Sequence, residues 1–392
     1  MEWKEYQIQD VCRLINGRAY SNDEMLEHGK YKIVRVGNLS GGNSTWFYSD
    51  LELPADKYCH NGDLLFAWAC TFGPHIWKED NTIFHYHIWK IVEDKDVVDR
   101  RFFYYYLKFA TGGFLGALNG SVMVHITKSS MEKMIIRIPK KLEDQRRIAS
   151  ILSSLDRKIE LNNKINADLE EMAQAIFKNW FVDFEPFKDG KFVDSELGMI
   201  PEGWKVISLS EIMKYNGGSQ PPASEFIDTY QEGYIRFIQI RDYDNDSHIT
   251  YIPISKRNKL CDELDIMIAR YGAALGRICW GLKGAYNVAL AKVTPIKSYY
   301  REYLRCYLNT SYFYQSINNK GARCAQSGFN QSDINSYMIA FPIDETVVMN
   351  FNDLCSSIMD KRLSLKYENS RLSLLRDTLL PRLMSGELEV PE

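Results

Sequence analysis

Two stretches of the chain carry mainly apolar residues that alternate in steps of three and four. The seam of the first stretch is formed by Ile148, Leu152, Leu155, Ile159, Asn162, Asn166, Leu169, Ala173, Ile176 and Trp180. The seam of the second is formed by Phe351, Leu354, Ile358, Leu365, Leu372, Leu375 and Leu379. A sustained heptad pattern predicts a long helix that packs along this stripe against another helix.

The two predicted helices are expected to pair with each other. Each has about forty residues, which at ~1.5 Å per residue gives a rod of roughly 60 Å. Because no other stretch of the chain matches this length, we predict an antiparallel coiled coil. The polar residues Asn162 and Asn166 on the seam are expected to fix its register at some cost in stability. A frayed or solvated stretch at these two residues is the alternative.

The rest of the chain alternates short strand-like runs with turns. Residues 31–36, 63–68 and 82–92 have the composition of strands, and Gly, Asn, Asp and Pro residues separate them. Residues 101–109 and 301–308 have a helical pattern. The predicted fold class is therefore α+β, with mixed α/β domains and two long helices.

The chain repeats itself after about two hundred residues. Lys90 and Ile91 return as Lys292 and Val293 after 202 positions, and similar pairs keep this spacing along the whole length. We therefore expect an internal pseudo-two-fold repeat. It divides the chain into a mixed domain at 1–142, a central helix at 143–185, a linker at 186–203, a second mixed domain at 204–342, and a distal helix with a C-terminal tail at 343–392.

Charge is distributed in step with this repeat. The net charge of -3 excludes a protein that coats nucleic acid through uniform positive charge. Residues 1–142 and 199–342 carry +1 and +3, whereas residues 143–198 and 343–392 carry -4 and -3. No apolar run reaches the ~18 residues of a membrane-spanning helix, and the first residues lack the pattern of a signal peptide. The cysteines, with no Cys-x-x-Cys pair, are typical of reduced thiols in a cytoplasmic protein.

The order of domain, helix, domain, helix favours duplex DNA as a target. Antiparallel helices would place two similar but non-identical domains at opposite ends of a coiled coil. Duplex DNA has matching local two-fold symmetry, so this arrangement suits a split, asymmetric site. The basic excess lies in the mixed domains, where contacts with phosphates would be needed.

Three motifs resemble the specificity subunit of type I restriction-modification systems. They are Gly-Met-Ile-Pro-Glu-Gly-Trp at 198–204, Leu-Asp-Ile-Met-Ile-Ala-Arg at 264–270, and Leu-Glu-Asp-Gln-Arg-Arg-Ile at 142–148. The resemblance covers the whole chain and implies two target-recognition domains, each followed by a helix. Trp68 departs from it, because the family often has Arg at this position, as at Arg270. The role of that arginine therefore does not carry over to the first domain.

The resemblance also implies partners and cofactors. The chain would be a non-catalytic DNA-reading subunit whose domains each read one half of a bipartite target, while the helices set the spacer. The helices would dock two methyltransferase (modification) subunits that bind S-adenosylmethionine and methylate adenine. Two motor-nuclease (restriction) subunits, which use ATP and Mg²⁺, would complete the restriction enzyme. The resemblance implies no cofactor in this chain.

Residues that could contact bases follow only from side-chain chemistry. Arg and Lys suit guanine, Asn and Gln suit adenine, and Ser or Thr can serve either base. An ordinary solvated loop is the alternative for each such residue. The candidates are Arg35, Asn38, Asn119, His125, Thr127, Lys128, Ser129, Gln239, Arg241, Arg270, Tyr271, Arg277, Arg323, Gln326, Asn330, Gln331 and Ser332.

Patterns for catalysis or metal binding are weak. No methyltransferase tetrapeptide and no phosphate loop occurs, and Asp80 with Glu93 and Lys95 only mimics a nuclease pattern. His85 and His87, near Cys59 and Cys70, could suggest zinc. Alternation along a strand would instead place both histidines on one face, as core or base-facing residues, and we expect no metal site.

Two other functions remain open from the residues. One is a two-domain coiled-coil scaffold that binds protein or carbohydrate, and the other is a self-sufficient nuclease. Neither explains why the duplication includes a coiled-coil spacer.

Overall fold

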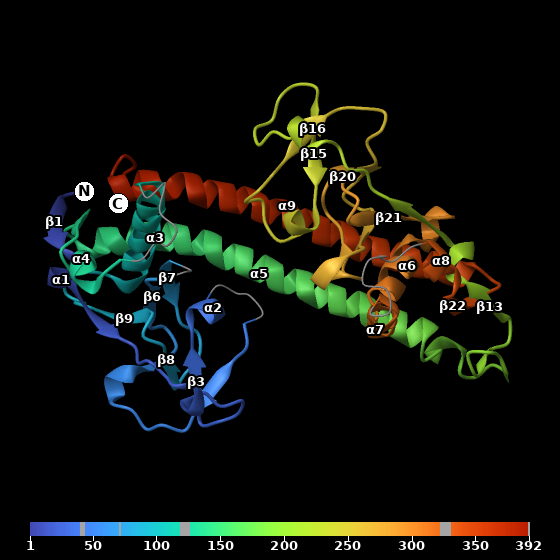
Figure 1. Cartoon of the computed structure of the whole chain (residues 1–392), viewed down its shortest axis with the longest axis horizontal. Coiled ribbons are helices and arrows are strands. Elements are labelled where there is room, and N and C mark those ends of the chain that lie inside the picture. Colours follow the sequence, from blue (N-terminus) through green and yellow to red (C-terminus); the bar gives the residue numbers. More distant parts are fainter. Residues whose placement is uncertain (40–43, 70–71, 118–125, 322–330, 391–392) are drawn as a thin grey trace. The chain divides into compact units, whose positions relative to one another are not determined.

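The chain folds into two compact units that have the same strand topology. The computed structural model describes residues 1–39, 44–69, 72–117, 126–321 and 331–390. Unit 1 contains residues 1–160 and 370–392, and unit 2 contains residues 161–369 (Figure 1). Each unit has two four-stranded sheets, a separate two-stranded ladder and several helices. The predicted α+β fold class is therefore confirmed.

Unit 1 contains a ladder that joins the two ends of the first mixed domain, β1 (Trp3–Gln7) with β10 (Ile135–Pro139). Its antiparallel sheet has the order β2 (Cys12–Asn16), β9 (Ile88–Glu93), β6 (Leu64–Ala67), β7 (Gly73–Ile76). Its mixed sheet, in which β3 and β8 are parallel, has the order β4 (Phe47–Ser49), β3 (Tyr31–Val34), β8 (Thr82–Phe84), β5 (Tyr58–Cys59). The helices are α1 (Ile8–Val11), α2 (Val36–Leu39), α3 (Arg100–Ala117) and α4 (Lys128–Glu132).

Unit 2 repeats this plan. Its ladder joins β13 (Trp204–Ser208) and β22 (Met338–Pro342). Its antiparallel sheet has the order β14 (Met213–Gly217), β21 (Leu290–Pro295), β18 (Ile266–Ala269), β19 (Ile278–Cys279). Its mixed sheet has the order β16 (Tyr251–Pro253), β15 (Tyr234–Ile238), β20 (Gly284–Tyr286), β17 (Leu260–Cys261), with β15 and β20 parallel. The helices are α6 (Arg301–Leu308), α7 (Ser311–Gly321) and α8 (Gln331–Asn335). The predicted repeat is thus confirmed in the topology of the two units.

The segment expected to be a linker, residues 186–203, belongs to the packed structure of unit 2. It contains the antiparallel hairpin of β11 (Phe192–Val193) and β12 (Ile200–Pro201). Ile200 is buried in the same hydrophobic core as Trp204, at the start of β13. The turn residues of this segment therefore form a hairpin rather than a free tether.

The long helices are α5 (Leu142–Phe181) and α9 (Thr346–Ser385), each of 40 residues (Figure 1). In unit 2, the Asn162 side-chain amide donates to Glu368 Oε2 and Asn369 Oδ1, both at 2.9 Å. Further along α5, Glu170 forms an ion pair with Arg362. The residue number in α9 falls from 368 and 369 to 362 as the residue number in α5 rises from 162 to 170. The helices are therefore antiparallel, as predicted.

The structure places most of the seam on buried or half-buried helix faces. Fully buried are Ile148, Leu152, Asn162, Ala173, Phe351, Ile358 and Leu365; half-buried are Leu155, Ile159, Asn166, Leu169, Ile176, Trp180, Leu372 and Leu379. The prediction was wrong for Leu354 and Leu375, which are 45% and 47% exposed. The stripe of α9 is less regular because it uses Cys355, Met359 and Arg362 between its apolar seam positions.

Asn162 lies inside the helix pair rather than on a solvated stretch, because none of it is exposed. Replacement of Asn162 by Ala leaves Glu368 and Asn369 without their shared donor. We expect this to lower the free energy of unfolding by about 1–3 kcal/mol, the usual cost of breaking a buried polar contact. Denaturant unfolding measures the loss. Lys164→Ala, a change at an exposed residue two positions along α5, is the control, and equal stability of both variants would contradict the structural role.

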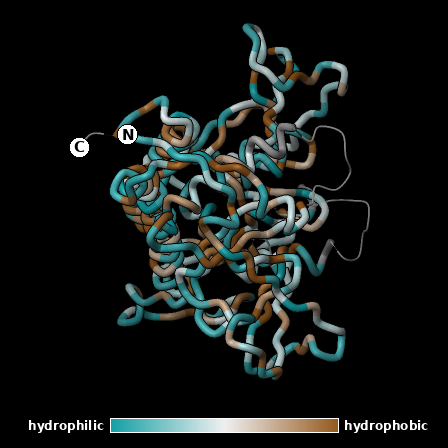
Figure 2. Tube along the Cα trace, turned by 90° about the vertical axis from the view of Figure 1, so that its left-hand side faces the viewer, coloured by the Kyte–Doolittle hydropathy of each residue, from teal (hydrophilic) through white to brown (hydrophobic). Residues whose placement is uncertain are grey.

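Hydrophilic stretches alternate with hydrophobic ones along the chain (Figure 2), and buried strand residues such as Leu64, Phe66, Ile266 and Ile268 belong to the hydrophobic cores. Within the described residues, no helix combines the length and hydropathy that crossing a membrane requires.

Candidate nucleic-acid interface

Strand ends from both sheets of unit 1 meet at one edge of the unit. Because β3 and β8 are parallel, Arg35 and His85 follow their strands on the same side, and His85 N–H donates to the Val34 carbonyl at 2.9 Å. Trp68 follows β6, and its N–H donates to the His87 carbonyl at 3.1 Å. Thr127 and Lys128 line the same cavity as Trp68 and Tyr86. We call this edge the strand-end surface, defined by Arg35, Trp68, His85, Tyr86, His87, Thr127 and Lys128.

The histidines of this surface lie in a turn, so the prediction of one strand over residues 82–92 was wrong. β8 ends at Phe84 and β9 begins at Ile88, and the two strands belong to different sheets. His85 and His87 therefore do not alternate along one strand face. Burial lowers the pKa of His85 to about 4, with smaller contributions from His87 and Arg35. His85 is thus neutral near pH 7 and adds no cation to the surface.

Unit 2 has the equivalent surface. Gln239 follows β15 and Asn287 follows the parallel strand β20, and Asn287 N–H donates to the Ile238 carbonyl at 3.0 Å. Arg241 is exposed nearby, with its Nε 3.9 Å from Asp242 Oδ1. Arg277, another candidate of unit 2, forms a 2.7 Å ion pair with Asp244.

Trp68 and Arg270 occupy the same position in the two units. Trp68 Nε1 donates to the carbonyl of Tyr86 at 2.9 Å, and Arg270 Nη1 donates to the carbonyl of Val288 at 3.2 Å. Each side chain therefore holds the equivalent turn after the mixed sheet. The sequence showed that Trp68 stands where the second repeat has Arg270, but it did not reveal that both side chains bind the equivalent turn. The matching spacing of residues 63–68 and 265–270 was the signal that could have revealed it.

A glycine packs against the same turn in each unit. A side chain on Gly17 would place its first carbon 2.2 Å from the carbonyl oxygen of His85, and one on Gly218 would approach that of Asn287 to 2.0 Å. No side chain fits at such distances. The close backbone approach therefore fixes the turn in each unit.

Two candidates for base contacts are already used by the local fold. Asn38 Oδ1 accepts from the Arg35 N–H at 3.0 Å, as Asp242 Oδ2 accepts from the Gln239 N–H at 2.8 Å. Thr127 caps α4, because its hydroxyl accepts from the Ser130 N–H at 3.2 Å. These groups mainly shape the surface.

The remaining unit 1 candidates keep their polar groups more available. Arg35 is exposed, has no ion pair within the described part of the chain, and lies 5.2 Å from the centre of the Phe47 ring. Lys128 Nζ is 3.6 Å from Glu132, and the Lys128 side chain is 41% exposed. Ser129 is exposed as well. Both cations can therefore reach a phosphate.

The other candidates divide into two groups. In unit 2, Tyr271 is 39% exposed, while Gln331 and Ser332 belong to α8. Outside the described residues lie Asn119, His125, Arg323, Gln326 and Asn330.

The patterns that suggested zinc or a nuclease do not form such sites among the described residues. No group of three or more His, Cys, Asp and Glu side chains there could hold a metal ion. Glu93 accepts a 2.8 Å hydrogen bond from Arg100, and Asp80 accepts one of 3.0 Å from the Asn61 N–H. Cys70 lies outside the described residues.

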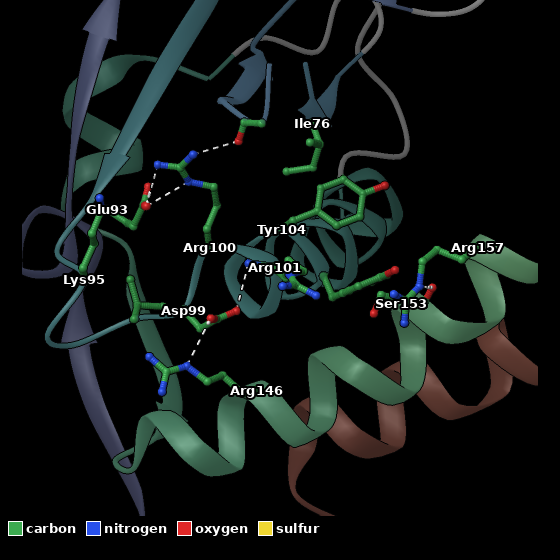
Figure 3. Close-up of a pocket in the computed structure, with 13 residues that line it drawn as sticks. Ile76, Glu93, Lys95, Asp99, Arg100, Arg101, Tyr104, Arg146, Ser153 and Arg157 are labelled. Carbon is green, nitrogen blue, oxygen red and sulfur yellow. Dashed lines mark hydrogen bonds and ion pairs between the residues drawn. The ribbon is translucent and has the colours of Figure 1, made fainter. Parts of the chain in front are cut away.

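A cavity of about 630 Å³ lies between α3 and the first half of α5 in unit 1 (Figure 3). Arg100, Arg101, Arg146 and Arg157 line it, and Arg146 lies 3.6 Å from Asp99. Glu93, at the last residue of β9, also lines the cavity, whereas the Tyr86 turn precedes the first residue of this strand. The cavity and the strand-end surface are therefore at opposite ends of β9. Replacement of an arginine of this cavity removes a positive charge from unit 1 without a change in the strand-end surface.

Comparison with known proteins decides the family. A family model described as "Type I restriction modification DNA specificity domain" matches residues 1–171 and again residues 201–363. The chain belongs to this family. The specificity family thus covers both repeats, which confirms the resemblance seen in the sequence and the identification as a DNA specificity subunit. It does not favour the scaffold for protein or carbohydrate.

Individual members of the specificity family are distant relatives. The type I restriction enzyme MjaIX specificity subunit of Methanocaldococcus jannaschii is 29% identical, over 76% of this chain and 71% of that protein. The HindI specificity subunit of Haemophilus influenzae is 25% identical, over 99% of this chain and all of that protein. The crystal structure of the type I S subunit from M. genitalium has a TM-score of 0.60 at 16% identity, and covers 98% of this chain and 96% of that one. This last likeness supports the fold.

Proposed function

We propose that each unit reads one half of a split, asymmetric DNA target through its strand-end surface, and that the paired helices set the spacer. One observation carries the proposal: the two units build the same surface around the same hydrogen-bonded turn, but with different side chains, Trp68 and Arg270. Equivalent scaffolds with different contacts suit two half-sites of different sequence.

The chemistry of restriction and modification is assigned to partner subunits. In this proposal the chain is a non-catalytic recognition subunit that docks two methyltransferase subunits and, with them, two motor-nuclease subunits. S-adenosylmethionine, ATP and Mg²⁺ would be bound by those partners. The cytoplasm is the expected location of such a complex.

A genome-wide map of methylated adenines tests the proposal in the source cell. Deletion of this gene is expected to abolish methylation at one split, asymmetric motif and to leave all other motifs methylated. Restoration of the gene should restore that motif. An unchanged map in a cell whose modification subunits are expressed would contradict the proposal.

Salt dependence tests the strand-end surface itself. In the complex with its modification subunits, Arg35→Ala is expected to weaken binding to the mapped target. It should also reduce the slope of log affinity against log salt by about 0.9, since one phosphate contact is lost. Fluorescence anisotropy measures both quantities.

Arg101→Ala is the matched control for this experiment, because it removes one cation from the distant cavity of the same unit. We expect it to leave the salt slope unchanged. An equal effect of both variants would show that total charge, rather than the strand-end surface, governs binding.

A further inference from the structure

A second cavity in unit 1, of about 390 Å³, opens beside the Tyr86 turn. Trp68, Tyr86, Trp89 and Ile126 give it a largely apolar lining, and Lys128 lies at it as well. Tyr86 is 40% exposed, so its ring is accessible at the cavity. The cavity lies on the strand-end surface, which makes it part of the proposed DNA interface.

The aromatic lining is rigid. The rings of Phe66 and Trp89 stack at 6.1 Å between centroids with an angle of 14°, and those of Trp89 and Trp68 at 5.8 Å with 21°. Phe66 and Trp89 are buried, so the stack starts in the core and ends at the cavity. The single polar group of Trp68, its Nε1, already donates to the Tyr86 carbonyl. Trp68 therefore presents only apolar surface to a ligand.

At the three ring positions of this lining, the described residues of unit 2 carry other side chains. Equivalent strand pairings relate Trp89, the partner of Asn16, to Ala291, the partner of Gly217. The shared hydrogen bonds relate Trp68 to Arg270, and the carbonyl that each of them binds relates Tyr86 to Val288. Three aromatic rings in one unit thus correspond to an arginine and two aliphatic residues in the other. Among the described residues, this aromatic lining therefore distinguishes the surface of unit 1 from that of unit 2.

We propose that this cavity receives the C5-methyl edge of a thymine in the half-site of unit 1. This inference rests on the proposed function and names the chemistry of one of its contacts. The thymine methyl is the apolar group that a base pair presents in the major groove, and apolar side chains recognise it. Lys128, partly exposed beside the cavity, supplies a cation for the neighbouring phosphate.

Replacement of thymine by deoxyuridine tests the inference, because it removes only the methyl group. The complex with the modification subunits is titrated with the mapped target, in which each thymine of the unit 1 half is replaced in turn. The half of the target that unit 1 reads is identified beforehand as the half that changes when residues 3–139 are exchanged for those of a relative. We expect one position to lose about fourfold in affinity, as for one buried methyl-sized group.

Protein variants show whether the cavity causes this loss. Tyr86→Ser is expected to abolish the difference between thymine and deoxyuridine at the sensitive position. Trp68→Arg, which offers a donor to the Tyr86 carbonyl as Arg270 does to Val288, should abolish it as well. Tyr314→Ser removes a ring of similar exposure from unit 2, 46% against 40%, and should leave the difference intact.

Each other outcome overturns a distinct claim. Specific binding with no effect of deoxyuridine anywhere in the unit 1 half overturns the thymine site alone. Enhanced oxidation of the sensitive thymine by permanganate would show an extruded base, which also overturns contact with the methyl edge of a paired base. Absence of sequence-specific binding by the wild-type complex would instead count against the proposed function.

Discussion

Insertion of four residues into each long helix is expected to lengthen the spacer of the DNA target by one or two base pairs and to leave both half-sites unchanged. The insertions are placed between Asn163 and Lys164 in α5 and between Asn369 and Ser370 in α9. Asn369 donates to Asn163 at 2.7 Å, so these two points are at the same level of the helix pair. The packing on either side of the insertions is thereby kept.

The expected size follows from two helical geometries. Four residues add about 6 Å of helix and rotate it by about 40° beyond a full turn. One base pair adds about 3.4 Å along the duplex and rotates it by roughly 34–36°. The rotation favours one added base pair and the length favours closer to two. Methylated adenines mapped in cells that express the variant with its partner subunits give the spacer directly.

A four-residue insertion after Asp189 is the matched control. It lies in an exposed turn that follows α5, and it changes neither long helix. We expect this variant to keep the original spacer. If the variant with insertions in both α5 and α9 also kept the original spacer, this would refute the proposal that the paired helices set the spacer length.

The helices and the repeat were predictable because their signal is local and periodic. Positions three and four residues apart share one face of a helix, so the heptad seam can be read without knowledge of the fold. Asn162 shows the limit of this reasoning. The pattern placed it on the seam, but only the contacts with Glu368 and Asn369 show that it is a buried contact rather than part of a solvated stretch.

The strand-end surface could be predicted only in part. The sequence identified Arg35 and Lys128, whose cationic chemistry is evident from the residue type alone. It missed the turn at His85 because residues 82–92 have the composition of a strand and include no Gly, Pro, Asn or Asp to mark a turn. The break arises because β8 pairs with the distant strand β3, whereas β9 pairs with β2 and β6. The periodicity of a short segment does not indicate which distant strands it pairs with.

The polar candidates show a second limit. Asn38 has the side chain that suits adenine, yet its carbonyl oxygen caps a turn. The repeat contained the warning, because Asp242 replaces it and makes the same capping contact with Gln239. A carboxylate in place of the amide indicates that both units need an acceptor at this position, rather than one base-specific contact. Residue type therefore overestimates base contacts wherever local backbone groups compete for the same side chain.

Exchange of residues 204–342 for the corresponding domain of a relative with another target is expected to replace one half of the recognition sequence completely. The other half and the spacer should stay the same. Trp204 and Pro342 are paired residues in the ladder of β13 and β22, as Trp3 and Pro139 are in β1 and β10. The two ends of the exchanged segment therefore lie side by side, so a domain of different internal sequence can be inserted without a change in the helices.

The donor domain must keep the aromatic residues that hold it on the helices of unit 2. Phe181 of α5 contacts the ring of Trp204 at 6.0 Å and that of Tyr303 at 4.9 Å between centroids, and Tyr303 contacts Phe341 at 5.3 Å. With these three domain residues retained, the chimera is co-expressed with the partner subunits and its methylated adenines are mapped. The reciprocal exchange of residues 3–139 should change only the opposite half. A chimera that alters both halves, while its modification subunits still methylate DNA, would show that each half is read by both units together, because independent surfaces can change only the half that they contact.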